Sequence, residues 1–163
     1  MPELINLKPE LITRENFEEF GEVCFEREDT AEYDKKLDLE LSFEIKNTRF
    51  WIMRLGPNNL DVAMDIGKIS RHVECSQCLG SVDNKIWYVA VCPPNNETEI
   101  PDLSKIQAFE IPPICTVKIN PGTWHEGPRS KYKFASYYNL EHKNTKSSDY
   151  RTHYIDKPYR INI

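Results

Sequence analysis

Long apolar stretches are missing from this 163-residue sequence. Crossing a bilayer takes about 20 consecutive apolar residues in a helix, and no segment approaches that length. The first six residues also lack the basic region and the apolar core of a signal peptide. Together these absences predict a cytoplasmic protein that has no membrane partner.

Dense basic runs are also missing. The chain carries 21 Lys and Arg residues against 26 Asp and Glu residues, for a formal net charge of -5. Nucleic-acid-binding domains typically concentrate Lys and Arg on one face, so we expect no nucleic-acid partner. An acidic chain can still bind a small anion in a locally basic pocket.

Internal repeats and low-complexity tracts are absent. Hydrophobic residues make up 39% of the chain and charged residues 29%, which is typical of a globular protein and not of a disordered one. The length predicts one domain over residues 1–163. Residues 141–163 are polar apart from several tyrosines, and we interpret them as a C-terminal arm of that domain.

A second Cys-x-x-Cys pair is missing as well. The chain has five cysteines, an odd number, and no export signal, which indicates reduced thiols. The one pair, Cys75 and Cys78, has the spacing of redox and zinc motifs. Residues three apart on a strand point to opposite faces, however, so we favour structural thiols over either chemistry.

What the sequence does contain is a series of short strand patterns, which predicts a mainly β protein. The predicted strands cover residues 48–55, 60–71, 77–82, 86–92, 106–111, 114–119 and 131–140. The run 86–92 is apolar throughout, which indicates burial on both faces. A short helix precedes them, with Thr13 as N-cap, Phe17 and Phe20 on one face, and Gly21 as the residue just past its end. Many short strands at spacings of about ten residues favour a barrel or sandwich.

The segment from Asn120 to His125 is the clearest functional signal. Pro121 restricts φ and Gly122 permits a positive φ, so the backbone itself defines a corner. The corner follows a predicted strand and delivers His125 onto the next one. This arrangement is suited to pointing an imidazole into a barrel. The neighbouring Trp124, like Trp87, is interpreted as core or pocket wall.

A second polar cluster lies about fifty residues upstream. His72 and Glu74 are two residues apart, so on a strand both side chains point to one face. His72 alone is equally compatible with a structural histidine. Together with His125, the pair predicts one site inside the barrel, with the two histidines and Glu74 as candidate catalytic residues.

Four further residues are candidate substrate-binding groups. A small carboxylate needs a fixed cation and hydrogen-bond donors, and Lys118, Ser76, Gln77 and Arg54 can supply them. Lys118 has an alternative interpretation as an exposed lysine of the barrel wall. We expect His72, Gln77, Lys118 and His125 to face a common cavity.

The same cluster raises the question of a metal ion. A metal ion held mainly by histidines needs about three converging His or carboxylate ligands, and His72, Glu74 and His125 are the candidates. The His-x-His pair usual in such sites is absent. A divalent metal ion is therefore a candidate cofactor, and no other cofactor is expected.

Five segments in order resemble the ureidoglycolate lyase (ureidoglycolate hydrolase) family of the cupin superfamily. They are residues 11–23, Arg71-His72 with Ser76-Gln77, residues 87–94, residues 101–109 and Trp124-His125. The resemblance implies a cupin-type jelly-roll β-barrel with a short N-terminal helix, a homodimer, and stimulation by divalent ions. It implies a lyase that eliminates urea from ureidoglycolate to give glyoxylate, a reaction of allantoin degradation in purine catabolism. Within it, His125 would act as acid and base, with His72 and Glu74 as the second proton-transfer or metal-binding group.

The chain also departs from that family's pattern. Glu126 stands where the family usually carries a second His, and Asn120-Pro121 replaces a family His at the corner. The family's [ILV]-D-R segment is matched to Tyr137-Tyr138-Asn139. These departures favour an alternative function, a non-catalytic or divergent cupin that binds a small carboxylate or a sugar.

Overall fold

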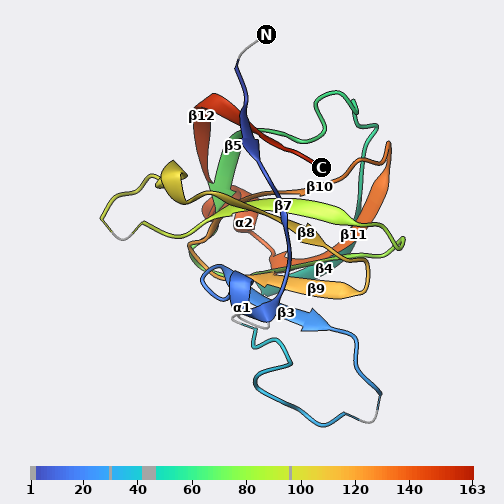
Figure 1. Cartoon of the computed structure of the whole chain (residues 1–163). Coiled ribbons are helices and arrows are strands. Elements are labelled where there is room, and N and C mark those ends of the chain that lie inside the picture. Colours follow the sequence, from blue (N-terminus) through green and yellow to red (C-terminus); the bar gives the residue numbers. More distant parts are fainter. Residues whose placement is uncertain (1–2, 30, 42–46, 96) are drawn as a thin grey trace.

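Two β-sheets face each other in the computed structural model (Figure 1), which describes residues 3–29, 31–41, 47–95 and 97–163. One sheet has the order β1-β12-β5-β10-β7-β8-β2 and the other has the order β3-β9-β6-β11-β4. The strands are β1 Ile5–Leu7, β2 Glu10–Leu11, β3 Gly21–Phe25, β4 Thr48–Leu55, β5 Asp65–Arg71, β6 Gln77–Ser81, β7 Trp87–Cys92, β8 Gln107–Ile111, β9 Cys115–Ile119, β10 Trp124–Arg129, β11 Ala135–His142 and β12 Arg151–Ile161. The helices are α1 Arg14–Phe17, η2 Leu103–Lys105 and α2 Thr145–Ser148.

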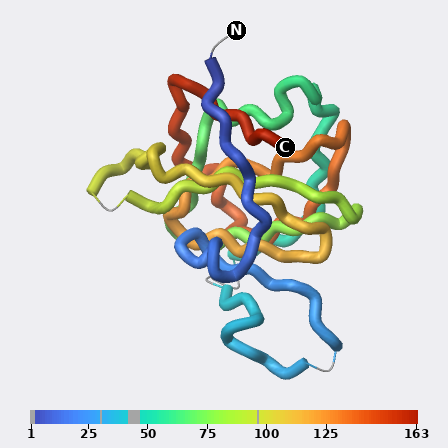
Figure 2. The backbone as a smooth tube through the Cα atoms, in the orientation of Figure 1, coloured from blue at the N-terminus to red at the C-terminus, as the bar shows by residue number. Residues whose placement is uncertain are grey.

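Most neighbouring strands are antiparallel, and only β1 with β12 and β2 with β8 are parallel. The sheets curl toward each other, whereas the described parts of the connection from β3 to β4 extend away from them (Figure 2). The predicted mainly β, cupin-type fold is confirmed. Among the described residues, no helix has the length and apolar character needed to cross a membrane.

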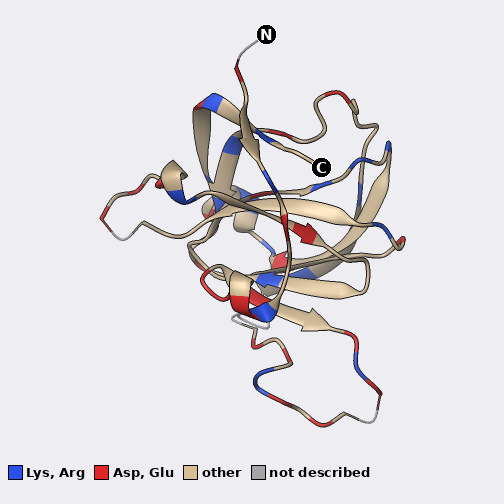
Figure 3. Cartoon of the chain, viewed as in Figure 1, with Lys and Arg blue, Asp and Glu red and all other residues tan. Residues whose placement is uncertain are grey.

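The hydrophobic core occupies both faces of β7. Trp87, Val89 and Val91 pack into a cluster between the two sheets, together with Phe109 of β8 and Val117 of β9. The alternate residues of β7 belong to a second cluster on the other face of the larger sheet. No charged residue interrupts the strand (Figure 3). The prediction that this run is buried on both faces is therefore confirmed.

The short N-terminal helix α1 begins as the sequence predicts. Thr13 accepts a hydrogen bond from the Asn16 backbone, and the Asn16 side chain accepts one from the Thr13 backbone, which forms a capping box. Phe17 is fully buried against Phe109. Gly21 has a different role from the predicted one, because it begins β3. A Cβ atom there would lie 1.8 Å from the Lys118 carbonyl oxygen, so close strand packing requires glycine.

Residues beyond 141 form part of the fold and not a separate arm. β12 pairs antiparallel with β5 and parallel with β1, which places it inside the larger sheet. Helix α2 lies between β11 and β12. The segment that joins α2 to β12 therefore reaches the space between the sheets, where it contributes to the site described next.

Candidate functional site

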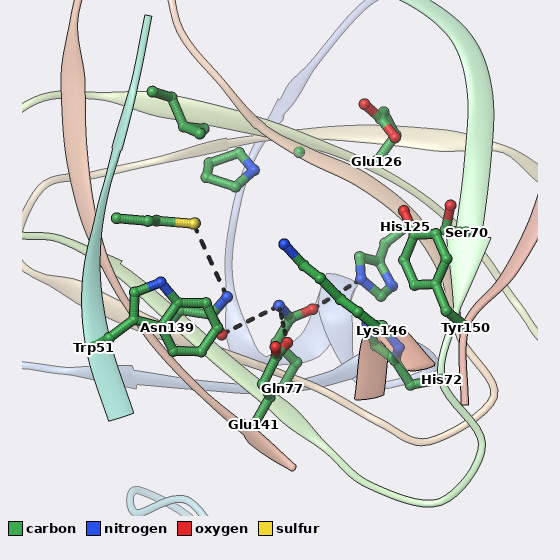
Figure 4. Close-up of a pocket in the computed structure, with 14 residues that line it drawn as sticks. Trp51, Ser70, His72, Gln77, His125, Glu126, Asn139, Glu141, Lys146 and Tyr150 are labelled. Atoms are coloured by element: carbon green, nitrogen blue, oxygen red, sulfur yellow. Dashed lines mark hydrogen bonds between the residues drawn. The ribbon is translucent and has the colours of Figure 1, made fainter. Parts of the chain in front are cut away.

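A cavity of about 170 Å³ lies between the two sheets. Its walls come from β4, β6 and β11 of the smaller sheet and from β5 and β10 of the larger one (Figure 4). His72, Gln77 and His125 line it, as the sequence predicts. We call it the first cavity. Among the described residues, these three side chains line no other cavity.

His72 and His125 face each other with ring centroids 5.3 Å apart. The corner before β10 contributes to both positions. Gly122 has φ of 85°, the left-handed conformation that glycine tolerates, and its backbone N–H donates to the His72 carbonyl at 2.5 Å. The side chain of Thr123 donates to the Phe20 carbonyl at 3.1 Å. The Pro-Gly corner thus delivers His125 and also fixes the backbone of His72.

One hydrogen bond orients the ring of His72. Its Nδ1 lies 3.1 Å from the carbonyl oxygen of Asp149. A carbonyl oxygen can only accept, so Nδ1 carries the hydrogen and Nε2 of the neutral ring carries a lone pair. Nε2 has no hydrogen bond to any described residue. His72 is therefore arranged as a base facing the first cavity.

His125 is held differently, because an oxygen faces each of its ring nitrogens. Nδ1 lies 3.0 Å from the Thr123 carbonyl and Nε2 lies 2.9 Å from Oε1 of Gln77. Burial, and to a smaller extent the nearby His72, lower the pKa of His125 to about 3, against a small opposing effect of Thr123. The ring is neutral at pH 7, so it has one N–H group and can donate to only one of the two oxygens.

A chain of buried polar side chains continues from His125. The amide nitrogen of Gln77 donates to Asn139 at 3.2 Å and to the carboxylate of Glu141 at 3.0 Å (Figure 4). Glu141 is 2% exposed and forms an ion pair with Arg49 at 2.5 Å. Because Asn139 and Glu141 both project inward from β11, the chain fixes the position of Gln77 in the cavity wall.

Lys146 supplies a cation that the sequence analysis missed. It belongs to α2, lines the first cavity and forms no ion pair with any described residue. Figure 4 shows its side chain reaching toward the part of the cavity where Gln77 and His125 lie. A free ammonium group at a cavity of this size is suited to holding a small carboxylate.

The predicted placement of Lys118 in the cavity is wrong. Its neighbours Val117 and Ile119 face the core, so the alternation of β9 turns Lys118 to the opposite face of the sheet. There its ammonium group donates to Glu22 and to the Glu40 carbonyl, both at 2.6 Å. Lys118 is buried and paired, and it is neither a cavity cation nor an exposed lysine.

Glu74 also lies outside the cavity, because residues 72–76 do not form a strand. β5 ends at Arg71 and β6 begins at Gln77, so the two-residue alternation that was to join His72 and Glu74 does not apply. The Glu74 side chain is exposed, and its backbone N–H donates to Asp149 at 2.8 Å.

Ser76 and Arg54 are likewise absent from the cavity wall. Ser76 is fully buried and its hydroxyl has no hydrogen-bond partner. Arg54 lies on the outer face of β4, over the ring of Phe134 at 4.3 Å, because the alternate residues 51, 53 and 55 face the cavity.

These positions also bear on a metal ion. The predicted ligand set of His72, Glu74 and His125 does not converge, since Glu74 points to solvent and both nitrogens of His125 face protein oxygens. In the part of the chain that the structure describes, no group of three or more His, Cys, Asp or Glu side chains is placed to hold one. The side chains present do not fit a tightly held metal, and we derive no reaction step from one.

The cysteines lie apart from this chemistry. All five are free, and Cys75 and Cys78 have separate surroundings. Cys75 lies 3.4 Å from the Thr145 hydroxyl, whereas burial raises the pKa of Cys78 to about 12. A thiol must lose its proton to react, so Cys78 is inert at pH 7.

A comparison with protein families finds that the family model for ureidoglycolate lyase matches residues 4–162. The chain belongs to the ureidoglycolate lyase family. A search of curated proteins finds no match.

Two residues of this family member were accessible to sequence reasoning and were missed. Glu141 directly follows the predicted strand 131–140 and has the same parity as Asn139, so strand alternation would place both on one face. Lys146 had only a weak signal, an unpaired lysine in a polar tail. The role of Asp149 depends on tertiary contacts alone.

Proposed function

We propose that this protein eliminates urea from ureidoglycolate and releases glyoxylate. Family membership supports the general chemistry. The observation that carries the proposal is that one cavity holds both His72, whose Nε2 bonds to no described residue, and Lys146, which pairs with no described carboxylate. The first is a base and the second binds a carboxylate, and this elimination needs both.

In the proposed reaction Lys146 holds the substrate carboxylate and His72 acts on the hydroxyl group. Nε2 of His72 takes the hydroxyl proton, the oxygen electrons form the carbonyl bond, and the C–N bond breaks toward the urea nitrogen. The imidazolium of His72 then returns the proton to that nitrogen. Atoms and charge balance with glyoxylate and urea as the two products, and no other reactant is needed.

His125 acts in this proposal as a positioning residue. Both of its nitrogens already face protein oxygens, so proton transfer is assigned to His72. His125 and Glu141 hold Gln77 from its two ends, and a fixed polar wall needs no rearrangement as charge develops on the substrate.

The test is an assay of purified protein for glyoxylate and urea in equal amounts, with and without added divalent ions. His72→Asn keeps a donor for the Asp149 carbonyl and removes the base. It should lower kcat by about 100-fold or more, as expected for a lost general base. His142→Asn is the matched control, because His142 is a half-buried histidine at the end of β11 that does not line the cavity. Full activity of His72→Asn would refute the mechanism.

Lys146→Met tests the carboxylate site separately. Losing one charged contact should raise KM by about tenfold or more and change kcat less. Lys143→Met is the control, because Lys143 is exposed, lies just before α2 and is outside the cavity. Its KM and kcat should match those of the unchanged protein. Substrate binding without any release of urea would instead support a non-catalytic cupin that binds a small carboxylate, which the Glu126 and Asn120 departures favour.

A further inference from the structure

A second cavity, about twice the volume of the first, lies beside it. Its volume is about 360 Å³, and the two share a wall formed by Leu55, residues 126–128 and Tyr150. Beyond this wall the second cavity has its own polar lining from β5, β10, β11 and the segment that follows β10. None of the candidate catalytic side chains lines it. What it contains is a set of hydrogen-bond donors that have no acceptor among the described residues.

Tyr137 is the most deeply buried of these donors. It is 0% exposed and its hydroxyl has no hydrogen-bond partner. Burial raises the pKa of Tyr137 to about 12, against a smaller opposing effect of the nearby Ser130. The hydroxyl therefore keeps its proton at pH 7. An unpaired buried hydroxyl is unfavourable, and native proteins usually supply a partner from protein, water or ligand.

Arg129 is a second donor with an unused hydrogen. One terminal nitrogen donates to Glu126 at 2.6 Å, while Nε is buried and has no acceptor. Guanidinium groups bind carboxylates most strongly through two parallel N–H groups. The contact with Glu126 therefore leaves Nε of Arg129 able to donate to a ligand.

The net charge of the second cavity also favours a ligand that accepts hydrogen bonds. Lys68 lines it, is exposed, and forms no ion pair with any described residue. Arg129 is balanced by Glu126, so Lys68 leaves an excess of one positive charge. This local excess occurs in a chain whose formal net charge is -5.

We propose that the second cavity binds a small organic carboxylate. Unpaired donors favour a ligand that accepts hydrogen bonds, and the excess positive charge favours an anion. Lys68, Arg129 and Tyr137 would hold its oxygens, and the larger volume admits a bigger molecule than the first cavity does. The proposal is independent of the lyase activity, because it rests on residues that take no part in the proposed reaction.

Malonate is a suitable probe, and its binding can be followed by calorimetry and by the rise in Tm that it causes. Tyr137→Phe removes only the hydroxyl, and the ring keeps its contact with Trp87. Without malonate this variant should have a Tm equal to or above that of the unchanged protein, because an unpaired buried group is gone. With malonate it should show a smaller rise in Tm.

Lys68→Met should weaken malonate binding by about tenfold, the effect of losing one charged contact. Lys133→Met is the matched control, because Lys133 is exposed and lies outside both cavities. It should leave malonate binding unchanged. Lys146→Met separates the two cavities. If it weakens malonate binding while Lys68→Met and Tyr137→Phe do not, the anion occupies the first cavity and the proposal is overturned. Absence of any malonate binding would overturn it as well.

Discussion

His72 and His125 are close neighbours whose surroundings prepare them for different tasks. His72 gives one nitrogen to a backbone carbonyl and keeps the other free for the cavity. His125 is enclosed, and both of its nitrogens face oxygens. A charged His125 would satisfy both oxygens, yet burial opposes the charge. The same residue type therefore supplies a base at one position and a neutral support at the other.

This enclosure makes the stability of the protein depend on pH. The pKa of His125 is about 3 in the folded protein, against 6.5 for the free side chain. The unfolded chain therefore gains a proton between pH 6.5 and pH 3 that the folded protein does not take up. Lowering the pH through this window favours unfolding, and at pH 5 the contribution of His125 amounts to a loss of about 2 kcal/mol.

The measurement is urea unfolding at pH 7 and pH 5. His125→Gln removes the titrating ring, so its free energy of unfolding should fall less between the two pH values than that of the unchanged protein. The other ionisable groups are shared and cancel in the comparison. Equal losses in both proteins would mean that His125 is not held neutral.

At the scale of the elements, the segment between α2 and β12 supports the site. The carboxylate of Asp149 accepts from the backbone of Val73 at 3.0 Å and of Glu74 at 2.8 Å, and its carbonyl accepts from His72. Residues 72–74, which directly follow β5, are therefore held by a residue 75 to 77 positions further along the chain.

Asp149→Ala tests this support. Two partly buried backbone N–H groups would lose their acceptor, which should lower the free energy of unfolding by about 1 kcal/mol. The proposed activity should fall as well, because residues 73 and 74 would no longer fix the backbone next to His72, although its ring keeps the bond to the carbonyl of residue 149. Asp156→Ala, at an exposed position of β12, serves as the control and should change neither. An Asp149→Ala protein with unchanged stability and unchanged activity would contradict the assigned role.

The strands could be predicted from sequence because their signals are local. Apolar runs such as 86–92 and turn residues such as Pro121-Gly122 specify strands and corners within a few residues. The site could be predicted only where a side chain follows such a signal, as His125 does. Strand alternation misplaces Glu74, because it lies between two strands, where contacts with Asp149 from far along the chain hold the backbone.

Lys118 and Lys146 show the same limit. Lys118 lies in an apolar strand pattern and Lys146 in a polar tail, and in neither case does the local sequence show whether the lysine reaches the cavity. Strand alternation places Lys118 on one face of β9 but does not show which face is the inner one. That depends on packing against α1 and β8. Lys146 reaches the cavity because β12 joins the larger sheet and brings α2 with it. That pairing has no short-range signal.

At the scale of the whole molecule, one sheet edge presents apolar side chains to solvent. β4 is an edge strand of the smaller sheet as described, and Phe50 and Ile52 on its outer face are 64% and 62% exposed. Phe50 lies against Tyr138, with ring centroids 5.9 Å apart. Uncovered apolar edge strands favour association, which agrees with the homodimer predicted from the sequence.

Sedimentation measurements on Ile52→Lys would test the homodimer. A charge on this face should shift the protein from a dimer toward a 19.1 kDa monomer, because burying an unpaired lysine opposes the contact. Val62→Lys, at a 49% exposed position away from β4, should leave the dimer intact. A monomer in the unchanged protein at micromolar concentration would refute the prediction.

The central strand β7 has a consequence for how the molecule opens. Its backbone is paired with β8 on one edge and β10 on the other, and both faces are covered. Its amide hydrogens can exchange with deuterium only when the whole sheet separates, whereas those of the exposed helix α2 can exchange through local fraying. One exchange experiment on β7 and α2 would therefore distinguish a variant that loosens the cavity from a variant that weakens the entire fold.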